Sequence, residues 1–201
     1  MIEYRMATEA DLPMIVETHI KCFPDYFLTS LGKKLLYLYY KSFFDECNLF
    51  LTAYDEGKMV AFTMGNLHTS RAKKNFEKKN AVRLFFRVLF LCIKFDKNAL
   101  ERVSRRLVPE KKEQNQMTEP PFIDVNWLSL CVLDDYRKMN IASELAVRFE
   151  SLLKQYNVKN YGGRTRRENI KMQKFFEKHG FYIADDNKVG ILYLKNVPYE
   201  D

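Results

Sequence analysis

Residues 130–145 are the most informative stretch of the sequence, because three local patterns follow one another there. An apolar run at 130–133 leads into the polar turn 134–140, which leads into an amphipathic stretch that begins at Ile141. At the start of a helix several backbone N–H groups have no intrahelical partner, and the helix dipole is positive there. The pattern therefore predicts a strand, a turn and a helix that together bind an anion such as a phosphate.

Within this turn, Arg137-x-x-Asn140-x-Ala142 resembles the pyrophosphate-binding turn of the GNAT acetyltransferase superfamily, usually written Arg/Gln-x-x-Gly-x-Gly/Ala. The small side chain of Ala142 lets backbone amides approach a diphosphate closely. Asn140 departs from the usual glycine, but asparagine tolerates left-handed backbone angles better than most residues. Arg137 and Lys138 add cations at the same place.

A second segment, residues 169–181, resembles a later helix of the same superfamily, where an early Asn is followed by an aromatic residue, Glu-Lys and a closing Gly-Phe. Asn169, Phe176 and Gly180 occupy those positions here. The residues by themselves describe an ordinary core helix that begins near Asn169 and ends at Gly180. Two motifs in the expected order and separation make the resemblance stronger than either motif alone.

The length of 201 residues suits one well-filled core, so we expect a single domain over residues 1–201. The sequence patterns predict two helices, over about 8–21 and 29–44, and strands at 2–5, 49–54, 59–66, 123–133, 159–164, 181–184 and 190–194. This order resembles the GNAT fold, an α/β architecture with a central mixed, twisted sheet flanked by helices. Residues 68–121 lie outside the resemblance, and we expect a helical insertion there between the third and fourth strands.

The insertion carries the positive charge of the chain. It holds 14 Lys and Arg residues against 6 acids, whereas the whole chain has a net charge of +7. Residues 81–95 predict a helix that is apolar nearly all round, with Arg83, Arg87 and Lys94 on a narrow stripe. Such a helix is expected to be buried. The alternatives are packing on the domain, which we favour, pairing with a second subunit in a homodimer, or lying in a lipid interface as a membrane contact.

The resemblance implies acetyl-coenzyme A as the co-substrate. In GNAT enzymes the pantetheine arm pairs with the backbone of the fourth strand, and the diphosphate lies on the turn that follows. Carried over position by position, the residues expected to bind the co-substrate are Leu130, Cys131, Val132, Arg137, Lys138, Met139, Asn140, Ile141, Ala142, Ser143, Asn169 and Phe176.

The resemblance also exposes a departure in the chemistry. The aromatic residue of the second motif is usually a Tyr that acts as the general acid, but Phe176 has no proton to give. General acid catalysis typically contributes about 10²–10⁴-fold, so its loss is expected to slow transfer rather than abolish it. The candidate bases are His68, Asp124 and a water held near Asn126 or Ser129.

The acceptor in GNAT enzymes lies between the first two helices and the thioester. That region is residues 23–32 here, so Asp25, Tyr26 and Phe27 are the candidate substrate-binding residues. The segment resembles those of GNAT-like proteins from bacterial surface-polysaccharide loci, which implies a small amine such as an amino sugar. An aromatic wedge that holds the two helices together is an equal alternative.

Other function classes are less well supported. No apolar leader and no run of about 20 apolar residues is apparent, which favours a cytoplasmic protein. Cysteines 22, 47, 92 and 131 form no C-x-x-C pair, so small buried apolar residues are expected rather than a metal site. The competing functions are a non-catalytic acyl-CoA-binding protein and an anionic-surface or nucleic-acid module that uses residues 68–121. No specific nucleic acid is expected, because the cations lack an aromatic stacking pattern.

Overall fold

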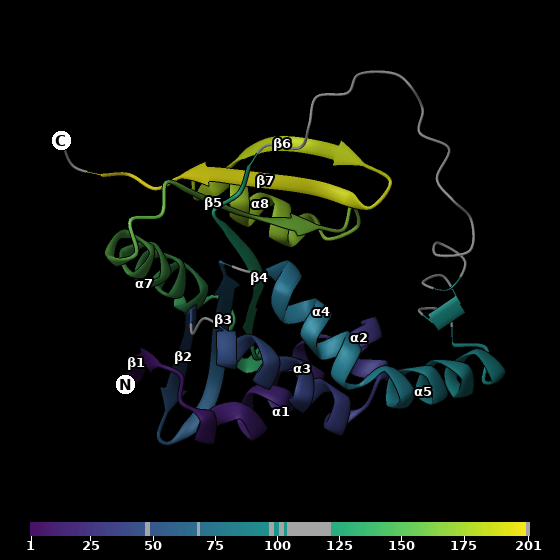
Figure 1. Cartoon of the computed structure of the whole chain (residues 1–201). Coiled ribbons are helices and arrows are strands. Elements are labelled where there is room, and N and C mark those ends of the chain that lie inside the picture. Colours follow the sequence, from purple (N-terminus) through teal and green to yellow (C-terminus); the bar gives the residue numbers. More distant parts are fainter. Residues whose placement is uncertain (47–48, 68, 97–98, 101–102, 104–121, 200–201) are drawn as a thin grey trace, which may run out of the picture.

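The computed structural model describes residues 1–46, 49–67, 69–96, 99–100, 103 and 122–199. Seven strands form one mixed sheet in the order β1-β2-β3-β4-β5-β7-β6 (Figure 1). Strands β4 and β5 are parallel, and the other neighbouring pairs are antiparallel. The strand bounds are Ile2–Met6 (β1), Leu49–Asp55 (β2), Lys58–Asn66 (β3), Val125–Val132 (β4), Asn160–Thr165 (β5), Tyr182–Asn187 (β6) and Gly190–Asn196 (β7). The expected mixed sheet flanked by helices is confirmed.

Helices cover both faces of this sheet. Helices α1 and α3 lie on one face and α7 and α8 on the other, while α4 packs on α3 and leads into α5 (Figure 1). The helix bounds are Glu9–Asp11 (η1), Leu12–Cys22 (α1), Phe27–Ser30 (α2), Lys33–Glu46 (α3), Thr69–Lys79 (α4), Ala81–Ile93 (α5), Asp134–Tyr136 (η2), Ile141–Gln155 (α7) and Ile170–Lys178 (α8).

The core has two parts because alternate strand residues point to opposite faces of the sheet. On the α1–α3 side, Tyr40 and Phe62 are fully buried with rings 5.7 Å apart. On the α7–α8 side, Trp127 stacks on Phe149 at 5.4 Å and on Phe181 at 5.7 Å. The sheet is therefore anchored on both faces, which fixes the position of β4 between them.

Two local signals explain where elements turn. Glu56 and Gly57 have φ of +48° and +78°, as a two-residue hairpin between β2 and β3 requires, and the predicted hairpin is confirmed. The single helix predicted over 29–44 is wrong, because Gly32 with φ of +88° ends α2 and lets α3 begin at Lys33.

Candidate functional site

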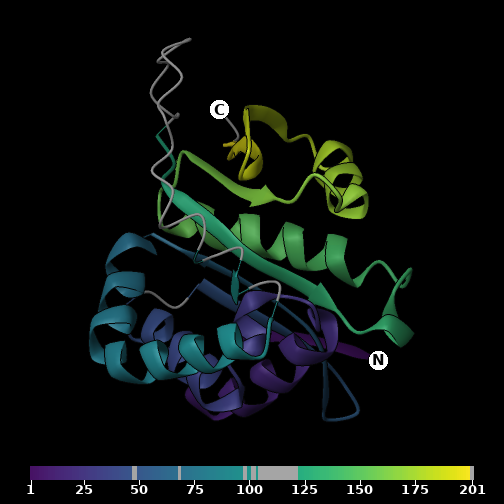
Figure 2. The same cartoon turned by 90° about the vertical axis from the view of Figure 1, so that its right-hand side faces the viewer.

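Strands β4 and β5 open like a fork. Within the described residues they pair only near their amino-terminal ends, Val125 with Tyr161 and Asn126 with Gly162. Beyond this point the two strands separate toward their carboxyl ends (Figure 2). On its other edge β4 stays paired with β3 as far as Val132. One edge of the carboxyl half of β4 is therefore left facing an opening in the sheet.

A bulge in β4 accompanies this separation. Ser129 is opposite Met64 and Trp127 is opposite Gly65, so Leu128 is an extra residue on β4. A bulge bends its strand and increases the local twist. The strands stay close at the base of the fork because β5 has glycine there: a Cβ on Gly163 would lie only 2.8 Å from the Trp127 carbonyl oxygen.

A cavity of about 900 Å³ lies at the open end of the fork. It is bounded by the end of α1 and the loop after it, the carboxyl half of β4, the turn before α7, and the β5–α8 connection with α8. The lining residues are Cys22, Phe23, Asp25, Tyr26, Leu130, Cys131, Val132, Tyr136, Arg137, Lys138, Asn140, Ile141, Ala142, Ser143, Arg166, Glu168, Asn169, Lys171, Met172, Phe175 and Lys178.

The turn before α7 has the geometry of an anion cradle. Lys138 and Asn140 both adopt left-handed backbone angles, with φ of +68° and +60°. Asn140 precedes α7, and its side chain accepts no hydrogen bond from the described amides at the start of the helix. Because Ala142 and Ser143 also line the cavity, the first turn of α7 is presented to it. Asn140 thus takes the backbone conformation for which glycine is usually selected.

The cavity lining is positively charged. Its cations come from the turn, the β5–α8 connection and α8, whereas its carboxylates are those of Asp25 and Glu168. The cations are Arg137, Lys138, Arg166, Lys171 and Lys178. A concave surface of one charge sign concentrates ligands of the opposite sign, so the arrangement favours a ligand with several negative charges.

The loop after α1 closes one side of the cavity. Tyr26 contacts the opposite wall through Arg166, whose Cζ lies 4.2 Å from the ring centroid, and the Phe23 ring lies 5.0 Å from Tyr26. Asp25 lines the same wall. Of the three candidate substrate-binding residues, Asp25 and Tyr26 thus lie at the cavity. The structure does not bring Phe27 there, because it begins α2 and lines a second cavity beside α5.

A row of buried polar side chains lies beneath β4. The Cys131 thiol donates a hydrogen bond to the Cys22 sulfur, which lowers the pKa of Cys22, whereas burial chiefly raises the pKa of Cys131. Farther in, His19 Nδ1 is 2.6 Å from Tyr40 Oη, and burial lowers the pKa of His19 to about 4. His19 is therefore neutral at pH 7. Of these groups, Cys22 and Cys131 line the cavity, whereas His19 and Tyr40 lie outside its lining.

Phe176 lies in the core rather than in the cavity lining. Its ring stacks on Tyr193 at 4.8 Å and packs on Phe181 at 4.9 Å. Its Cζ points toward the base of the fork, because a Cβ built on Gly163 would be 3.3 Å from it. The neighbouring Phe175 lines the cavity instead. A hydroxyl on Phe176 would therefore point to the place where β4 and β5 diverge.

Other expected site residues have different surroundings. The carboxylate of Asp124 accepts hydrogen bonds from Lys159 N at 2.8 Å and Asn160 N at 3.2 Å, at the amino end of β4. The hydrogen bonds show that Asp124 ties the start of β4 to the start of β5. Because this position is about 20 Å along the strand from Leu130, Asp124 is not brought to the cavity. Met139 is exposed outside the cavity lining, and His68 lies outside the described residues.

The lining contains residues that sequence reasoning missed. Lys171, Phe175 and Lys178 follow the spacing of one helical face, i, i+4 and i+7, so the signal was present in the sequence. Asn169 begins the same helix, where its Oδ1 accepts a hydrogen bond from Met172 N at 3.2 Å. No sequence pattern marks Arg166, because its place in the cavity depends on a contact with Tyr26, which is far from it in the sequence.

Comparisons with known proteins bear on the fold. No protein-family model and no curated protein sequence matches the chain. Among solved structures, the PaiA N-acetyltransferase of Thermoplasma acidophilum in complex with coenzyme A is 14% identical, with a TM-score of 0.60 over 98% of this chain and 99% of that one. The ribosomal-protein-S18-alanine N-acetyltransferase of Escherichia coli is 12% identical, with a TM-score of 0.60 over 100% and 97%.

The polyamine N-acetyltransferase of Drosophila melanogaster is 11% identical, with a TM-score of 0.58 over 98% of this chain and 100% of that one. These matches span nearly the whole chain, with the same mixed sheet and flanking helices. The chain therefore has the fold of the GNAT N-acetyltransferases.

Proposed function

We propose that this protein is an acetyl-coenzyme A-dependent N-acyltransferase that acts on a small amine. The observation that carries the proposal is the fork between β4 and β5, which opens into a basic cavity beside the start of α7. An extended chain with amide groups fits the free edge of β4, and a diphosphate fits the turn. Coenzyme A combines these two chemical features in one molecule.

One group of cavity residues would bind the pantetheine arm of coenzyme A, and another would bind its diphosphate. Of the three expected strand residues, Leu130 and Val132 turn their backbone groups to the open edge of β4, and these groups would hydrogen-bond the pantetheine arm. The backbone groups of Cys131 face β3, where Cys131 is opposite Phe62. The amides that begin α7, together with Arg137 and Lys138, would hold the diphosphate. Arg137 remains available because its ion pair with Asp134 is solvent-exposed, and such pairs are weak.

The thioester would supply an activated acyl group to the amine. Asp25 and Tyr26 are suitably placed to orient a cationic or hydroxylated amine at the cavity wall. With Asp124 held at the other end of β4, a water near Ser129 is our candidate for removing the amine proton. Phe176 cannot protonate the departing thiolate, so water would also supply that proton, at a cost in rate.

The acceptor class rests on the shape of the cavity and on the fold neighbours. One structure with this fold is an arylalkylamine N-acetyltransferase of Aedes aegypti, and another is the polyamine enzyme of Drosophila melanogaster. An amino sugar is our finer proposal, because Tyr26 and Phe23 offer rings against which a sugar can pack beside the carboxylate of Asp25.

Calorimetric titration with acetyl-coenzyme A, followed by thiol-release assays over amino sugars, polyamines, arylalkylamines and peptide N-termini, tests this function. Saturable binding with thiol release for one amine class is the expected result. Failure to bind acetyl-coenzyme A would contradict the proposal.

A second candidate function is a non-catalytic acyl-CoA-binding protein. The observation that favours it is Phe176, whose ring occupies the position of the usual acid without a proton to donate. Tight binding of acetyl-coenzyme A without thiol release to any amine would select this second function.

A further inference from the structure

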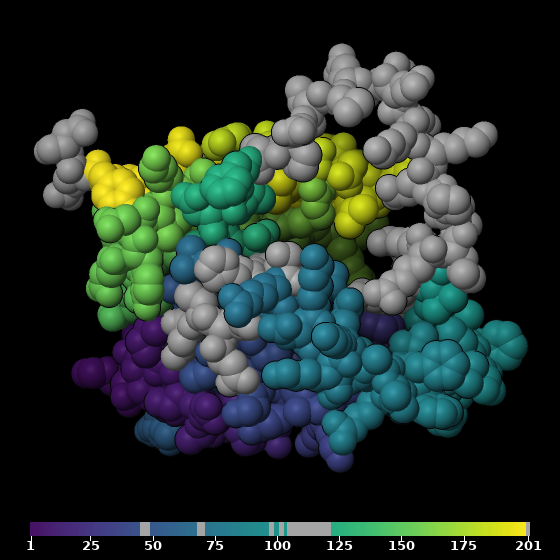
Figure 3. Space-filling view, in the orientation of Figure 1, coloured from purple at the N-terminus to yellow at the C-terminus, as the bar shows by residue number. Residues whose placement is uncertain are grey.

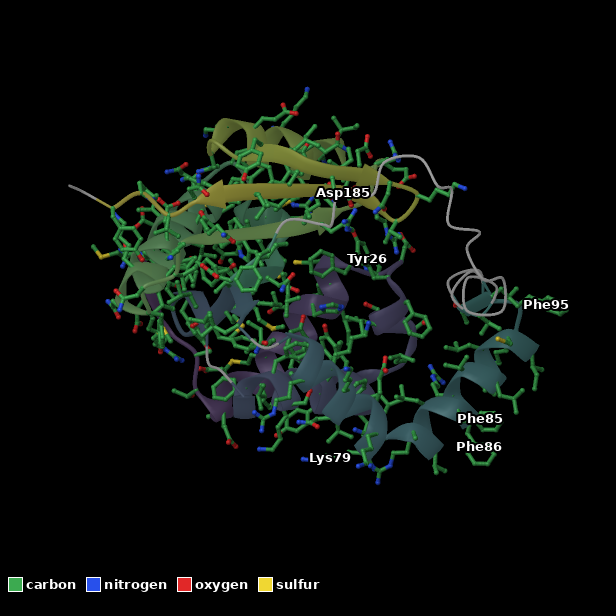
Figure 4. All side chains as sticks on the ribbon, turned by 45° about the horizontal axis from the view of Figure 1, so that its top comes forward. Tyr26, Lys79, Phe85, Phe86, Phe95 and Asp185 are labelled. Carbon is green, nitrogen blue, oxygen red and sulfur yellow. The ribbon has the colours of Figure 1, made fainter. Side chains whose placement is uncertain are left out.

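Helix α5 exposes its apolar side chains, contrary to the expectation that the helix packs on the domain. Leu91 is buried and Leu84 and Val88 are half-buried, but six other apolar residues of the helix are not covered. Their exposed fractions are 70% for Val82, 63% for Phe85, 63% for Phe86, 45% for Leu89, 45% for Phe90 and 67% for Ile93. The helix projects from the body, and Phe85 and Phe86 point away from it (Figures 3 and 4).

These six residues, which we call the α5 apolar face, form one continuous strip. At 3.6 residues per turn they fall within an arc of about 140° around the helix axis. Leu84 and the buried Leu91 lie on the opposite side of the helix, where Leu84 packs on the body. The exposed surface is therefore one continuous face of a regular helix. Soluble proteins usually expose apolar residues singly rather than in such a continuous patch.

Cations border the α5 apolar face. Arg83, Arg87 and Lys94 follow one another along a single edge of the strip, and the Lys94 Nζ lies 4.7 Å from the Phe90 ring centroid. The preceding helix α4 is also basic, with five Lys and Arg residues and one Glu. Lys79, the last residue of α4, is exposed (Figure 4). An apolar strip edged by cations is the pattern of a helix that lies in a membrane interface.

An apolar cavity adjoins this face. It has a volume of about 660 Å³ and lies between α2, α3, α4 and α5. Phe85 and Leu89 belong both to the α5 apolar face and to the cavity lining, which is otherwise formed by residues such as Leu31 and Phe76. A hydrocarbon chain that covered the face could thus continue into the protein.

We propose that the α5 apolar face docks the protein on an anionic lipid surface. The apolar side chains would enter the acyl boundary while Arg83, Lys94 and the lysines of α4 meet the headgroup phosphates. Arg87 instead donates hydrogen bonds to the Ser30 carbonyl oxygen at 3.1 and 2.7 Å, which holds the helix on the body. A second copy of this chain fits less well, because a symmetric contact would bring the cations of both α4–α5 units together. The proposal concerns a surface separate from the fork, so it does not depend on acyl transfer. Among the described helices, none is long and apolar enough to cross a bilayer.

Vesicle co-sedimentation of the full chain tests the proposal. The probes are phosphatidylcholine vesicles with and without 30% phosphatidylglycerol, at low salt and at 0.5 M NaCl. We expect binding to the anionic vesicles that falls at least about tenfold in high salt or without the anionic lipid. Absence of binding to anionic vesicles at low salt would overturn the proposal.

Paired variants locate the binding surface. Phe85→Ser with Phe86→Ser should reduce vesicle binding at least about tenfold, since both side chains are lost from the acyl boundary. Tyr182→Ser with Ile183→Ser is the matched control, because these residues form an exposed pair on β6, with exposed fractions of 53% and 54%. Equal loss in both pairs, or no loss in either, would contradict docking through α5.

A charge-reversal pair separates lipid docking from self-association. Lys78→Glu with Lys79→Glu should weaken vesicle binding and leave the mass in solution unchanged, whereas Lys159→Glu with Lys188→Glu should change neither. Light scattering completes the test. Suppose that the wild-type protein does not bind vesicles, is a dimer in solution, and becomes a monomer when Phe85 and Phe86 are replaced. The α5 apolar face would then be a contact with a second copy of the chain, and the lipid proposal would be wrong.

Discussion

The fork cavity and the α5 apolar face combine the same two ingredients, apolar side chains and cations, in opposite shapes. In the cavity, Lys138 and Lys171 surround a concave space together with the backbone of β4. On α5, Arg83 and Lys94 border a convex strip of exposed side chains. The first arrangement can enclose a discrete anion, whereas the second can only meet an extended surface. Shape therefore separates two basic regions that composition alone does not distinguish.

The two regions also differ in how firmly they are built into the fold. The cavity is formed by elements that the sheet and both core clusters hold in place. Helix α5 touches the body along one side, through Leu84, Val88 and the hydrogen bonds from Arg87 to the Ser30 carbonyl oxygen. Substitutions in the framework of the cavity should therefore cost stability, and those on the α5 apolar face should not.

The largest effect is expected from Phe176→Ala in the core beside the fork. Removing a buried phenylalanine typically costs about 3–5 kcal/mol, and the ring contacts to Tyr193 and Phe181 would be lost with it. Urea denaturation measures the change. Phe175→Ala is the control, since this half-buried neighbour should cost less than half as much. Equal costs would show that Phe176 is not a core residue of the fork.

A smaller loss is expected from Asp11→Asn, on the framework shared by both regions. The Asp11 carboxylate accepts hydrogen bonds from Arg5 at 2.7 and 2.8 Å, from Tyr54 Oη and from Thr8 N. Arg5, the largest cause, holds the pKa of Asp11 well below its usual range. Breaking the pair should cost about 2–4 kcal/mol at pH 7, less than a fully buried pair because Arg5 is partly exposed.

The stabilisation by the Asp11–Arg5 pair should depend on pH in a definite direction. Because the folded protein lowers the pKa of Asp11, the stabilisation is fully present above the unfolded value of about 4 and is lost as the pH falls below it. The difference between wild type and Asp11→Asn should therefore shrink from pH 7 to pH 3 in urea denaturation. A difference that grows on acidification would contradict the role of the Arg5 pair.

Next in size is the effect of Ala142→Trp on the concave region. A bulky side chain at the start of α7 should block the amides of the cradle and weaken acetyl-coenzyme A binding at least about 30-fold, or about 2 kcal/mol. Calorimetry measures the affinity. Val147→Trp on the exposed side of the same helix should leave it unchanged. Vesicle binding should be the same in both variants, because the two regions are separate.

The sequence predicted the succession of strands and helices better than the helix boundaries and the order of strands in the sheet. The order of strands and the strand–turn–helix at residues 130–145 were recognisable because apolar periodicity and turn residues are local signals. The break at Gly32 was missed, since a helix pattern continues on both sides of it. The position of β7 between β5 and β6 was also unpredicted, because strand order depends on contacts distant in sequence.

The site was predictable where its residues are adjacent in the chain. Residues of β4 and the following turn reach the cavity together because one strand and one helix start present them. Arg166 and Tyr26 meet across the cavity from elements far apart in sequence, and no local pattern marks such a contact. Asp124 shows the reverse case: the sequence pattern includes this acid in the strand that leads to the cavity, but it lies just before β4, at the end of the strand away from the cavity.

A modest effect is expected from Phe176→Tyr, which restores a hydroxyl at the base of the fork. Since the ring tip already points toward Gly163, the added O–H should reach the region where the thiolate departs, and turnover should rise about three- to tenfold. Acetyl-coenzyme A affinity should not change. Phe181→Tyr adds the same group elsewhere in the cluster and should give no gain. Unchanged turnover in Phe176→Tyr would mean that thiolate protonation does not limit the rate.

The smallest effect is expected on the convex region, where Phe85→Ser with Phe86→Ser should leave the melting temperature within about 2 °C of the wild type. Both side chains are exposed in the folded protein, so little burial is lost. Leu84→Ser with Leu91→Ser, on the opposite side of the same helix, should lower it by several degrees. Thermal denaturation of both double variants measures the two changes in melting temperature. Large destabilisation by the phenylalanine pair would mean that another surface covers this face in solution, and the contrast between an enclosed and an exposed region would no longer hold.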